Sequence, residues 1–191
     1  SNELRGAGGF LTGYAIMTLD QGKIIDIQVD SSLSLDRLIE GKIEPPSVVK
    51  QLLNQQNWSF RDSNLDADFA INARQASWFY QRFKNQVVDG VIGLNTNILR
   101  FYLNEIGSVK LPSGQTLDEG NFNQLASNAT SNQGLDVPTS LTKVLAEKLI
   151  AGELPFVGLA RVLLKAISFH EINFWFSSYP LDALAEMSGL T

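Results

Sequence analysis

The feature that most restricts the fold is a pair of strand-like runs near the start of the chain. Residues 10–19 and 23–29 are rich in β-branched and aromatic side chains, and the Asp-Gln-Gly between them has the chemistry of a tight turn. In the second run Ile25, Ile27 and Val29 alternate with polar residues, so one face should be buried and the other wet. The pattern predicts an antiparallel β-hairpin.

The last third of the chain has helical periodicity in two segments. Residues 141–151 carry an apolar stripe, residues 152–155 supply a turn, and residues 156–168 are apolar almost all round. A helix that is apolar on every side is normally buried on most of its sides. The sequence therefore predicts a helical hairpin over 141–168 whose second helix is largely buried.

The remaining segments are shorter and alternate between the two periodicities. Residues 118–138 are small and polar, which is typical of a mobile loop, and residues 1–8 are typical of a flexible tail. The other expected elements are helices over 35–40, from 46, over 75–85, 98–106 and 181–187, and strands over 58–73, 87–94, 109–111, 116–117 and 171–176.

These elements together predict a single α+β domain over residues 1–191. An antiparallel sheet begins with the hairpin at 10–29 and packs against helices that include the C-terminal helical hairpin at 141–168. With 191 residues and 44% apolar side chains, the chain can bury a core without disulfides or a structural metal.

Charge and cysteine content exclude several classes of function. The net charge is −5 and no segment gathers lysine and arginine, so nucleic acid and anionic membranes are disfavoured partners. The absence of cysteine excludes thiol nucleophiles, Cys-based zinc sites and iron–sulfur clusters. No apolar run is long enough to cross a bilayer, and no cofactor motif is present.

Composition favours a periplasmic or secreted protein over a cytoplasmic one. Asn, Gln and Ser are abundant relative to Lys and Arg. The chain begins at Ser1-Asn2 rather than at methionine, which fits either removal of a signal peptide or a scar left by a tag.

An acidic run raises the possibility of a cation site. Asp62, Asn64, Asp66 and Asp68 have the alternating oxygen ligands that suit calcium. The sixth position of this run is alanine where an EF-hand loop needs glycine, and the twelfth is alanine where it needs glutamate. Two readings follow, the solvated face of a strand and an irregular calcium site.

The sequence contains few of the motifs that are typical of enzymes. His170 is the only histidine, and no G-x-S-x-G elbow offers a serine nucleophile. One interpretation is a structural histidine at a helix C-terminus. The other is a carboxylate-dependent hydrolase of glycosides or peptidoglycan, for which the candidate catalytic residues are His170, Glu171 and Asp182.

Aromatic residues gather in two short segments, one in the predicted helix 75–85 and one in the closing strand. Consecutive aromatic residues in a strand cannot all face one core, so some of them should line a second layer, a pocket or an interface. The candidate ligand-binding residues are Trp78, Tyr80, Phe83, Trp175 and Tyr179.

The sequence thus predicts a non-catalytic envelope or secreted domain that binds an apolar small molecule, a lipid or a protein partner through an aromatic-lined face. Two alternatives stay open. One is the carboxylate-dependent hydrolase, and the other is a structural domain that assembles into a homo-oligomer.

Overall fold

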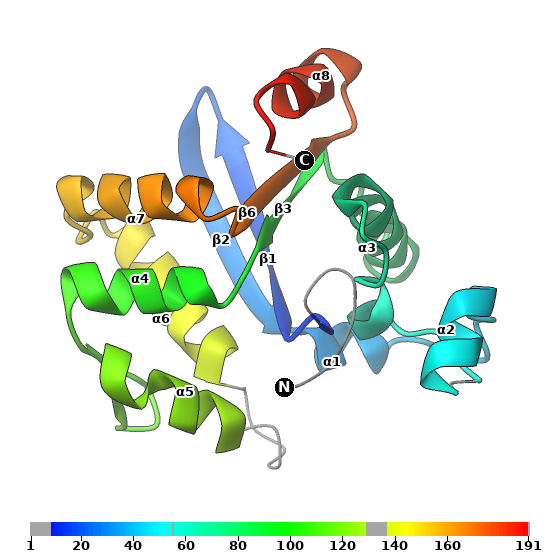
Figure 1. Cartoon of the computed structure of the whole chain (residues 1–191), viewed down its shortest axis with the longest axis horizontal. Helices are drawn as coiled ribbons and strands as arrows, with labels where there is room; N and C mark the ends of the chain where they lie inside the picture. The colour runs from blue at the N-terminus through cyan, green and yellow to red at the C-terminus, as the bar shows by residue number, and fades with distance from the viewer. Residues whose placement is uncertain (1–8, 55, 129–136, 191) are drawn as a thin grey trace. The chain divides into compact units, whose positions relative to one another are not determined.

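In the computed structural model, the described residues are 9–54, 56–128 and 137–190 (Figure 1). They form a mixed α+β structure with an N-terminal antiparallel hairpin, as the sequence predicts. The chain divides into two compact units. Unit 1 contains the residues up to 11, residues 32–93 and the residues from 172 onward, and unit 2 contains 12–31 and 94–171. The predicted tail, residues 1–8, lies outside the described residues.

The hairpin of unit 2 consists of β1 (Gly13–Asp20) and β2 (Lys23–Ser31). Its register pairs Gly13 with Ser31, and a bulge between Thr18 and Leu19 shifts the register near the turn. Gln21 and Gly22 have positive φ angles of 47° and 78°, as a tight hairpin turn requires. These features confirm the predicted hairpin.

The predicted burial of one hairpin face holds only near its base. Ile27 and Val29 are half-buried on β2, against which helix α6 (Val137–Ile150) packs. Ile25 is exposed, contrary to the alternation of the sequence, and so are the neighbouring apolar side chains of the hairpin end: Met17, Leu19 and Ile24.

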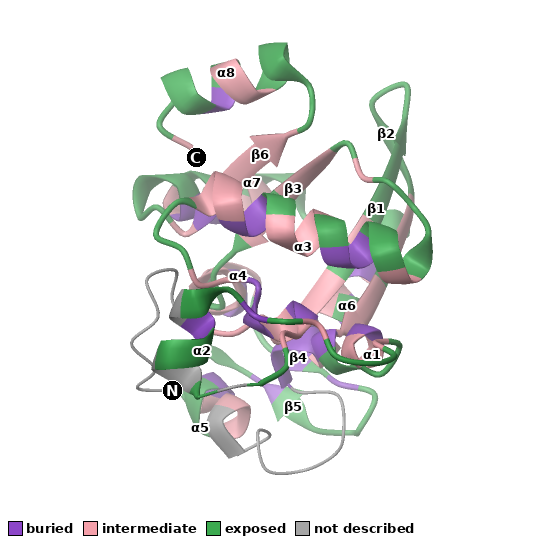
Figure 2. Ribbon diagram, turned by 90° about the vertical axis from the view of Figure 1, so that its right-hand side faces the viewer, coloured by how far each residue is buried: buried purple, intermediate pink, exposed green. Residues whose placement is uncertain are grey.

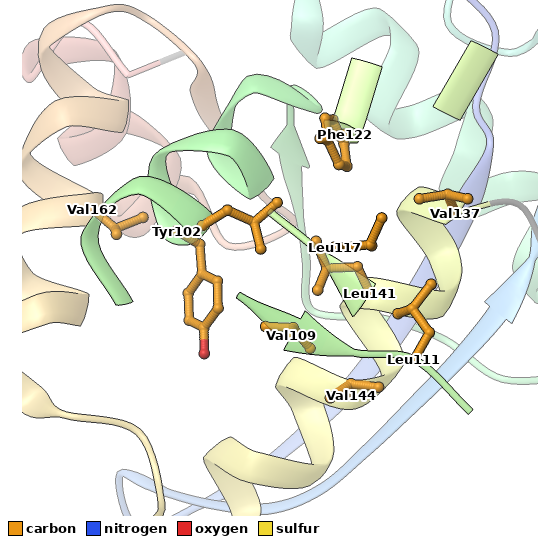
Figure 3. Close-up of a cluster of buried hydrophobic side chains, with 10 residues drawn as sticks. Tyr102, Val109, Leu111, Leu117, Phe122, Val137, Leu141, Val144 and Val162 are labelled. Atoms are coloured by element: carbon orange, nitrogen blue, oxygen red, sulfur yellow. The ribbon is translucent and has the colours of Figure 1, made fainter. Parts of the chain in front are cut away.

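The core of unit 2 lies between its helices and a small hairpin. The elements are α4 (Asn97–Ile106), β4 (Val109–Lys110), β5 (Thr116–Leu117), α5 (Glu119–Asn128), α6 and α7 (Phe156–Ser168). The buried side chains of this core come from these elements and, at Leu111, from the turn between β4 and β5 (Figure 3): Tyr102, Leu103, Val109, Leu111, Leu117, Phe122, Val137, Leu141, Val144 and Val162. The predicted helix over 98–106 and small hairpin over 109–117 are confirmed.

Helix α5 corrects the prediction of a loop over 118–138. Asp118 and Asn121 cap it reciprocally, since each backbone N–H donates to the other's side-chain Oδ1, at 3.0 and 2.9 Å. Phe122 then buries its ring in the core, which fixes the helix within unit 2. Residues 129–136 of the predicted loop lie outside the described residues.

Helix α7 has the predicted bounds, but the prediction that it is buried on most sides is wrong. It packs on α4 through one seam, where Val162 and Ala166 are buried. Phe156 is 83% exposed and Leu164 is 65% exposed. The helix therefore has a large apolar surface in water.

Unit 1 begins with three short helices: α1 (Ser32–Asp36), α2 (Ser47–Leu53) and the 3₁₀ turn η1 (Phe60–Asp62). Helix α3 (Phe69–Lys84), β3 (Gly90–Leu94), β6 (Ile172–Phe176) and α8 (Tyr179–Met187) complete it. The helix expected over 35–40 both begins and ends earlier, since α1 runs from Ser32 to Asp36.

The structure contradicts the strand predicted over 58–73. That segment contains η1, a turn and the first residues of α3. Asn72 explains the difference because its buried amide holds the turn: Oδ1 accepts the N–H groups of Leu65 and Asp66, and Nδ2 donates to the carbonyl of Asp66 at 2.8 Å. With the turn fixed, Asp68 starts the helix.

Strands β3 and β6 form a two-stranded sheet in which Ser177, just after β6, donates to the carbonyl of Asp89, just before β3. The strands are therefore antiparallel. Because Gly93 has no side chain, the ring of Phe69 from α3 lies directly against its backbone. This contact packs α3 against one face of the sheet.

Candidate aromatic face on helix α3

Helix α3 positions three of the five aromatic residues that the sequence singled out, Trp78, Tyr80 and Phe83. Asp68 caps it by accepting the N–H of Ala70 at 2.8 Å, and Asn85 ends it in the left-handed conformation. Phe79 and Tyr80 are buried along one side, while Trp78 is 41% exposed. Figure 2 shows buried and exposed residues mixed along α3 in this way.

Trp78 lies in a group of aromatic rings. Its indole stacks on that of Trp58 with ring centroids 6.0 Å apart and planes 16° apart. Phe79 meets both indoles edge-on, at 4.8 Å from Trp58 and 5.0 Å from Trp78. The guanidinium of Arg82, one turn along α3, lies 5.6 Å from the centroid of Trp78. We call Trp58, Trp78 and Arg82 the tryptophan face.

Trp58 reaches this group because the loop before η1 is held in place. Its backbone N–H donates to the carbonyl of Ile43 at 2.8 Å. Its indole Nε1 is buried and has no hydrogen-bond acceptor among the described residues, which typically costs about 1–3 kcal/mol. Stacking with Trp78 and the edge contact with Phe79 offset part of that cost.

The half-buried carboxylate of Asp36 and the buried carboxylate of Asp62 fix the turn that follows Trp58. Asp36 accepts the N–H of Phe60 at 2.7 Å, and Ser59 donates its hydroxyl to Asp62 at 2.6 Å. Burial raises the pKa of the Asp36 carboxyl, and hydrogen bonds from the backbone of Phe60 and Arg61 oppose this shift. In the part of the chain that the structure describes, the second carboxylate oxygen of Asp36 is buried without a hydrogen-bond partner.

The structure does not gather all five predicted ligand-binding residues. Phe83 stacks on Phe79 at 6.3 Å, next to the tryptophan face. Tyr80 is buried, donates to Gln86 at 2.8 Å, and lies about 200° around the helix from Trp78.

The two residues near the C-terminus lie elsewhere in unit 1. Phe176 faces the same side of the sheet as Gly90, so strand alternation turns Trp175 to the opposite side, where Gly93 meets α3. Trp175 is half-buried there, and Tyr179 is exposed on α8.

Two members of the tryptophan face were not predicted from the sequence. Trp58 is 20 positions before Trp78, and a stack over such a separation has no local pattern. Arg82 does have a local signal, since a cation four residues after an aromatic residue shares its side of a helix.

Of the three residues considered for catalysis, Glu171 and Asp182 accept hydrogen bonds within the fold. His170 is exposed just after α7, with a φ of 53°. Glu171 accepts the side-chain amide of Asn97 at 2.8 Å. Asp182 accepts the backbone N–H of Phe176 at 3.1 Å and so covers part of the outer edge of β6.

The four residues of the acidic run are divided between different tasks. Asp62 accepts the hydroxyl of Ser59, and Asn64 donates to the carbonyl of Gly9 at 3.0 Å. Asp66 accepts the N–H of Asp68, which itself caps α3. Among the described residues, no group of three or more Asp, Glu, His or Cys side chains is placed to hold a metal ion.

Comparison with known proteins adds a family to this description. Within residues 9–54, 56–128 and 137–190, no helix has the length and apolarity that a membrane crossing needs. No curated protein and no solved structure matches the chain. Residues 1–130 match the family model described as "Protein of unknown function (DUF4012)", and because this match covers more than half of the 191 residues, the chain belongs to that family.

Proposed function

We propose that the chain is a non-catalytic binding domain and that the tryptophan face binds a protein partner. The observation that carries this proposal is the position of Trp78, which keeps 41% of its surface in water while Trp58 and Phe79 hold its ring. A large aromatic side chain fixed in this way loses little conformational entropy on binding.

The chemistry of this face favours a protein over a small apolar molecule. Tryptophan and arginine are the residue types most enriched among interface hot spots, and here Trp78 and Arg82 lie side by side. Small apolar ligands instead favour concave sites that enclose most of their surface. Trp78 lies on the outward side of a helix, and such a site suits a partner that brings its own pocket.

The composition of the chain supports a location in the cell envelope or outside the cell for this binding domain. Fractionation of cells that express the protein tests this part of the proposal. Recovery of the protein only in the cytosol would contradict it.

Site-specific photo-crosslinking tests the tryptophan face. A photoreactive amino acid replaces Gln81, which is exposed on α3 between Trp78 and Arg82, and the matched control replaces Gln124, which is exposed on α5. We expect a discrete crosslinked product from position 81 and none from position 124. In the chain that carries the photoreactive residue at position 81, the additional substitution Trp78→Ala should weaken binding of the partner about 30-fold, as expected for a hot spot.

Two results would contradict the proposal. One is the same set of crosslinked products from positions 81 and 124. The other is a product from position 81 that Trp78→Ala leaves unchanged in a chain whose circular dichroism shows it to be folded.

A further inference from the structure

Helix α7 of unit 2 presents an apolar outer face that is independent of the tryptophan face. Its members are exposed and fall within an arc of about 120° at 3.6 residues per turn. They are Phe156, Val157, Leu163, Leu164 and Ile167. Val162 and Ala166 on the other side are buried where α7 packs on α4. We call the five exposed residues the α7 outer face.

The two charged side chains of α7 itself, Arg161 and Lys165, are both positive. Residues 154–170 contain no acidic side chain, although the whole chain has 20. Arg161 and Lys165 lie along one edge of the outer face and both reach Glu105 on α4, at 3.7 and 2.8 Å. The hydrogen bond from Lys165 is the main reason why the pKa of Glu105 is lowered. Since one carboxylate faces two cations, the edge keeps a net positive charge.

We propose that the α7 outer face docks on a lipid surface that carries anionic headgroups. An apolar face bordered by arginine and lysine is the pattern of a helix that lies in the membrane interface, with aliphatic and Phe side chains among the acyl chains and cations at headgroup level. Its members have no polar side-chain atom. Hydrocarbon, which offers no directional contacts, suits such a surface.

The size and composition of the face argue against a second copy of the chain as the occupant. Thirteen residues make a helix about 20 Å long, and with a width of about 10 Å its footprint is far below the roughly 800 Å² per partner of a stable interface. The face also lacks tryptophan, tyrosine and arginine at its centre, which are the usual hot-spot residues.

The net charge of −5 opposes adsorption of the whole chain to an anionic surface. Insertion of the apolar side chains must therefore supply most of the affinity, while Arg161 and Lys165 add selectivity for anionic headgroups. Removal of an apolar member should thus weaken binding more than removal of a cation.

Co-sedimentation of the whole chain with vesicles tests this inference. The probes are vesicles of phosphatidylcholine alone and of phosphatidylcholine with one-third phosphatidylglycerol. We expect tighter binding to the mixed vesicles, at least about tenfold weaker binding of Leu164→Glu, and about fivefold weaker binding of Arg161→Gln. Val87→Glu adds the same charge at an apolar residue that is 74% exposed in unit 1, and it should bind like the unsubstituted chain.

Each other outcome overturns the inference. The comparison with Leu164→Glu requires that its circular dichroism matches that of the unsubstituted chain. Val157→Glu, at another exposed position of the α7 outer face, is the second variant for the same comparison. No sedimentation with either vesicle, or equal binding of Leu164→Glu and Val87→Glu, refutes docking on lipid. A concentration-dependent dimer that Leu164→Glu dissociates, without vesicle binding, assigns the face to a second copy instead.

Discussion

Two alanine substitutions within α7 test whether its outer face is free of protein contacts. Val162 is 4% exposed and belongs to the core of unit 2, whereas Leu164, two residues later, is 65% exposed. Leucine loses more carbon atoms than valine when it is replaced by alanine. If both positions were equally buried, Leu164→Ala would therefore be the more destabilising change.

The structure predicts the opposite order. Val162→Ala removes two buried carbons, which with the resulting cavity costs about 2 kcal/mol, and the better helix propensity of alanine returns about 0.5 kcal/mol. Leu164→Ala removes three carbons that are only about one-third buried, so at about 0.8 kcal/mol per buried carbon its cost is about 0.8 kcal/mol. We expect net losses of about 1.5 kcal/mol for Val162→Ala and about 0.6 kcal/mol for Leu164→Ala.

Urea unfolding followed by circular dichroism at 222 nm measures both values. Tryptophan fluorescence is unsuitable here because all three tryptophans, Trp58, Trp78 and Trp175, belong to unit 1. A loss for Leu164→Ala that equals or exceeds that of Val162→Ala would show that protein covers the outer face in the folded chain. That result would refute the premise on which docking to lipid depends.

Two further predictions concern unit 1, where tryptophan fluorescence is the suitable signal. Gly93→Ala should destabilise the unit by about 1–3 kcal/mol, because the added Cβ would lie 2.4 Å from the ring of Phe69; an unchanged urea midpoint would contradict this packing. Asp36→Asn should gain stability relative to the unsubstituted chain as the pH rises from about 4 to about 7. Burial raises the pKa of the Asp36 carboxyl in the folded state above its value in the unfolded state. Below the unfolded pKa the carboxyl is protonated in both states and its ionisation does not affect stability. As the pH rises through the folded pKa, the unsubstituted chain loses stability, whereas Asp36→Asn does not. An equal difference between the two chains at both pH values would contradict this reasoning.

Strong local periodicity made several elements predictable. The hairpin over β1 and β2 has both alternation and turn residues, and α4 ends at Gly107, whose φ of 98° suits glycine. The start of α7 follows from Pro155 before it, and its length from the leucine- and alanine-rich run 159–166 within it. In each case the local signal and the tertiary contacts agree.

Two errors arose where a short polar capping motif outweighed the composition around it. Residues 65–69 alternate like a strand, but Asp68 caps a helix and Asn72 holds the preceding turn. Residues 118–128 look like a polar loop, yet Asp118 and Asn121 form a reciprocal cap in front of Phe122. The signal was present in both segments, in the spacing of the capping residues.

The candidate site was less predictable because it depends on contacts between distant segments. The sequence identified Trp78 and Phe83, which lie on one helix. It could not identify Trp58, whose place beside Trp78 depends on the turn that Asp36 stabilises. It also grouped Trp78 with Tyr80, although two residues along a helix point in nearly opposite directions.

In a helix that is apolar on most sides, such as α7, the sequence does not directly show which face is buried. The sizes of the side chains on each face of α7 indicate it. Its seam against α4 consists of residues spaced by four: Gly158, Val162 and Ala166. A Cβ on Gly158 would lie 3.2 Å from Ile106, so the two helices approach closely at this point. Small residues thus mark the face that packs within unit 2, while the large ones, such as Phe156 and Leu164, point outward. Since larger side chains gain more free energy from burial, a sequence selected only for the stability of unit 2 would place them on the seam. Their position on the outside is best explained by a second apolar surface that covers them, which is the role we propose for lipid.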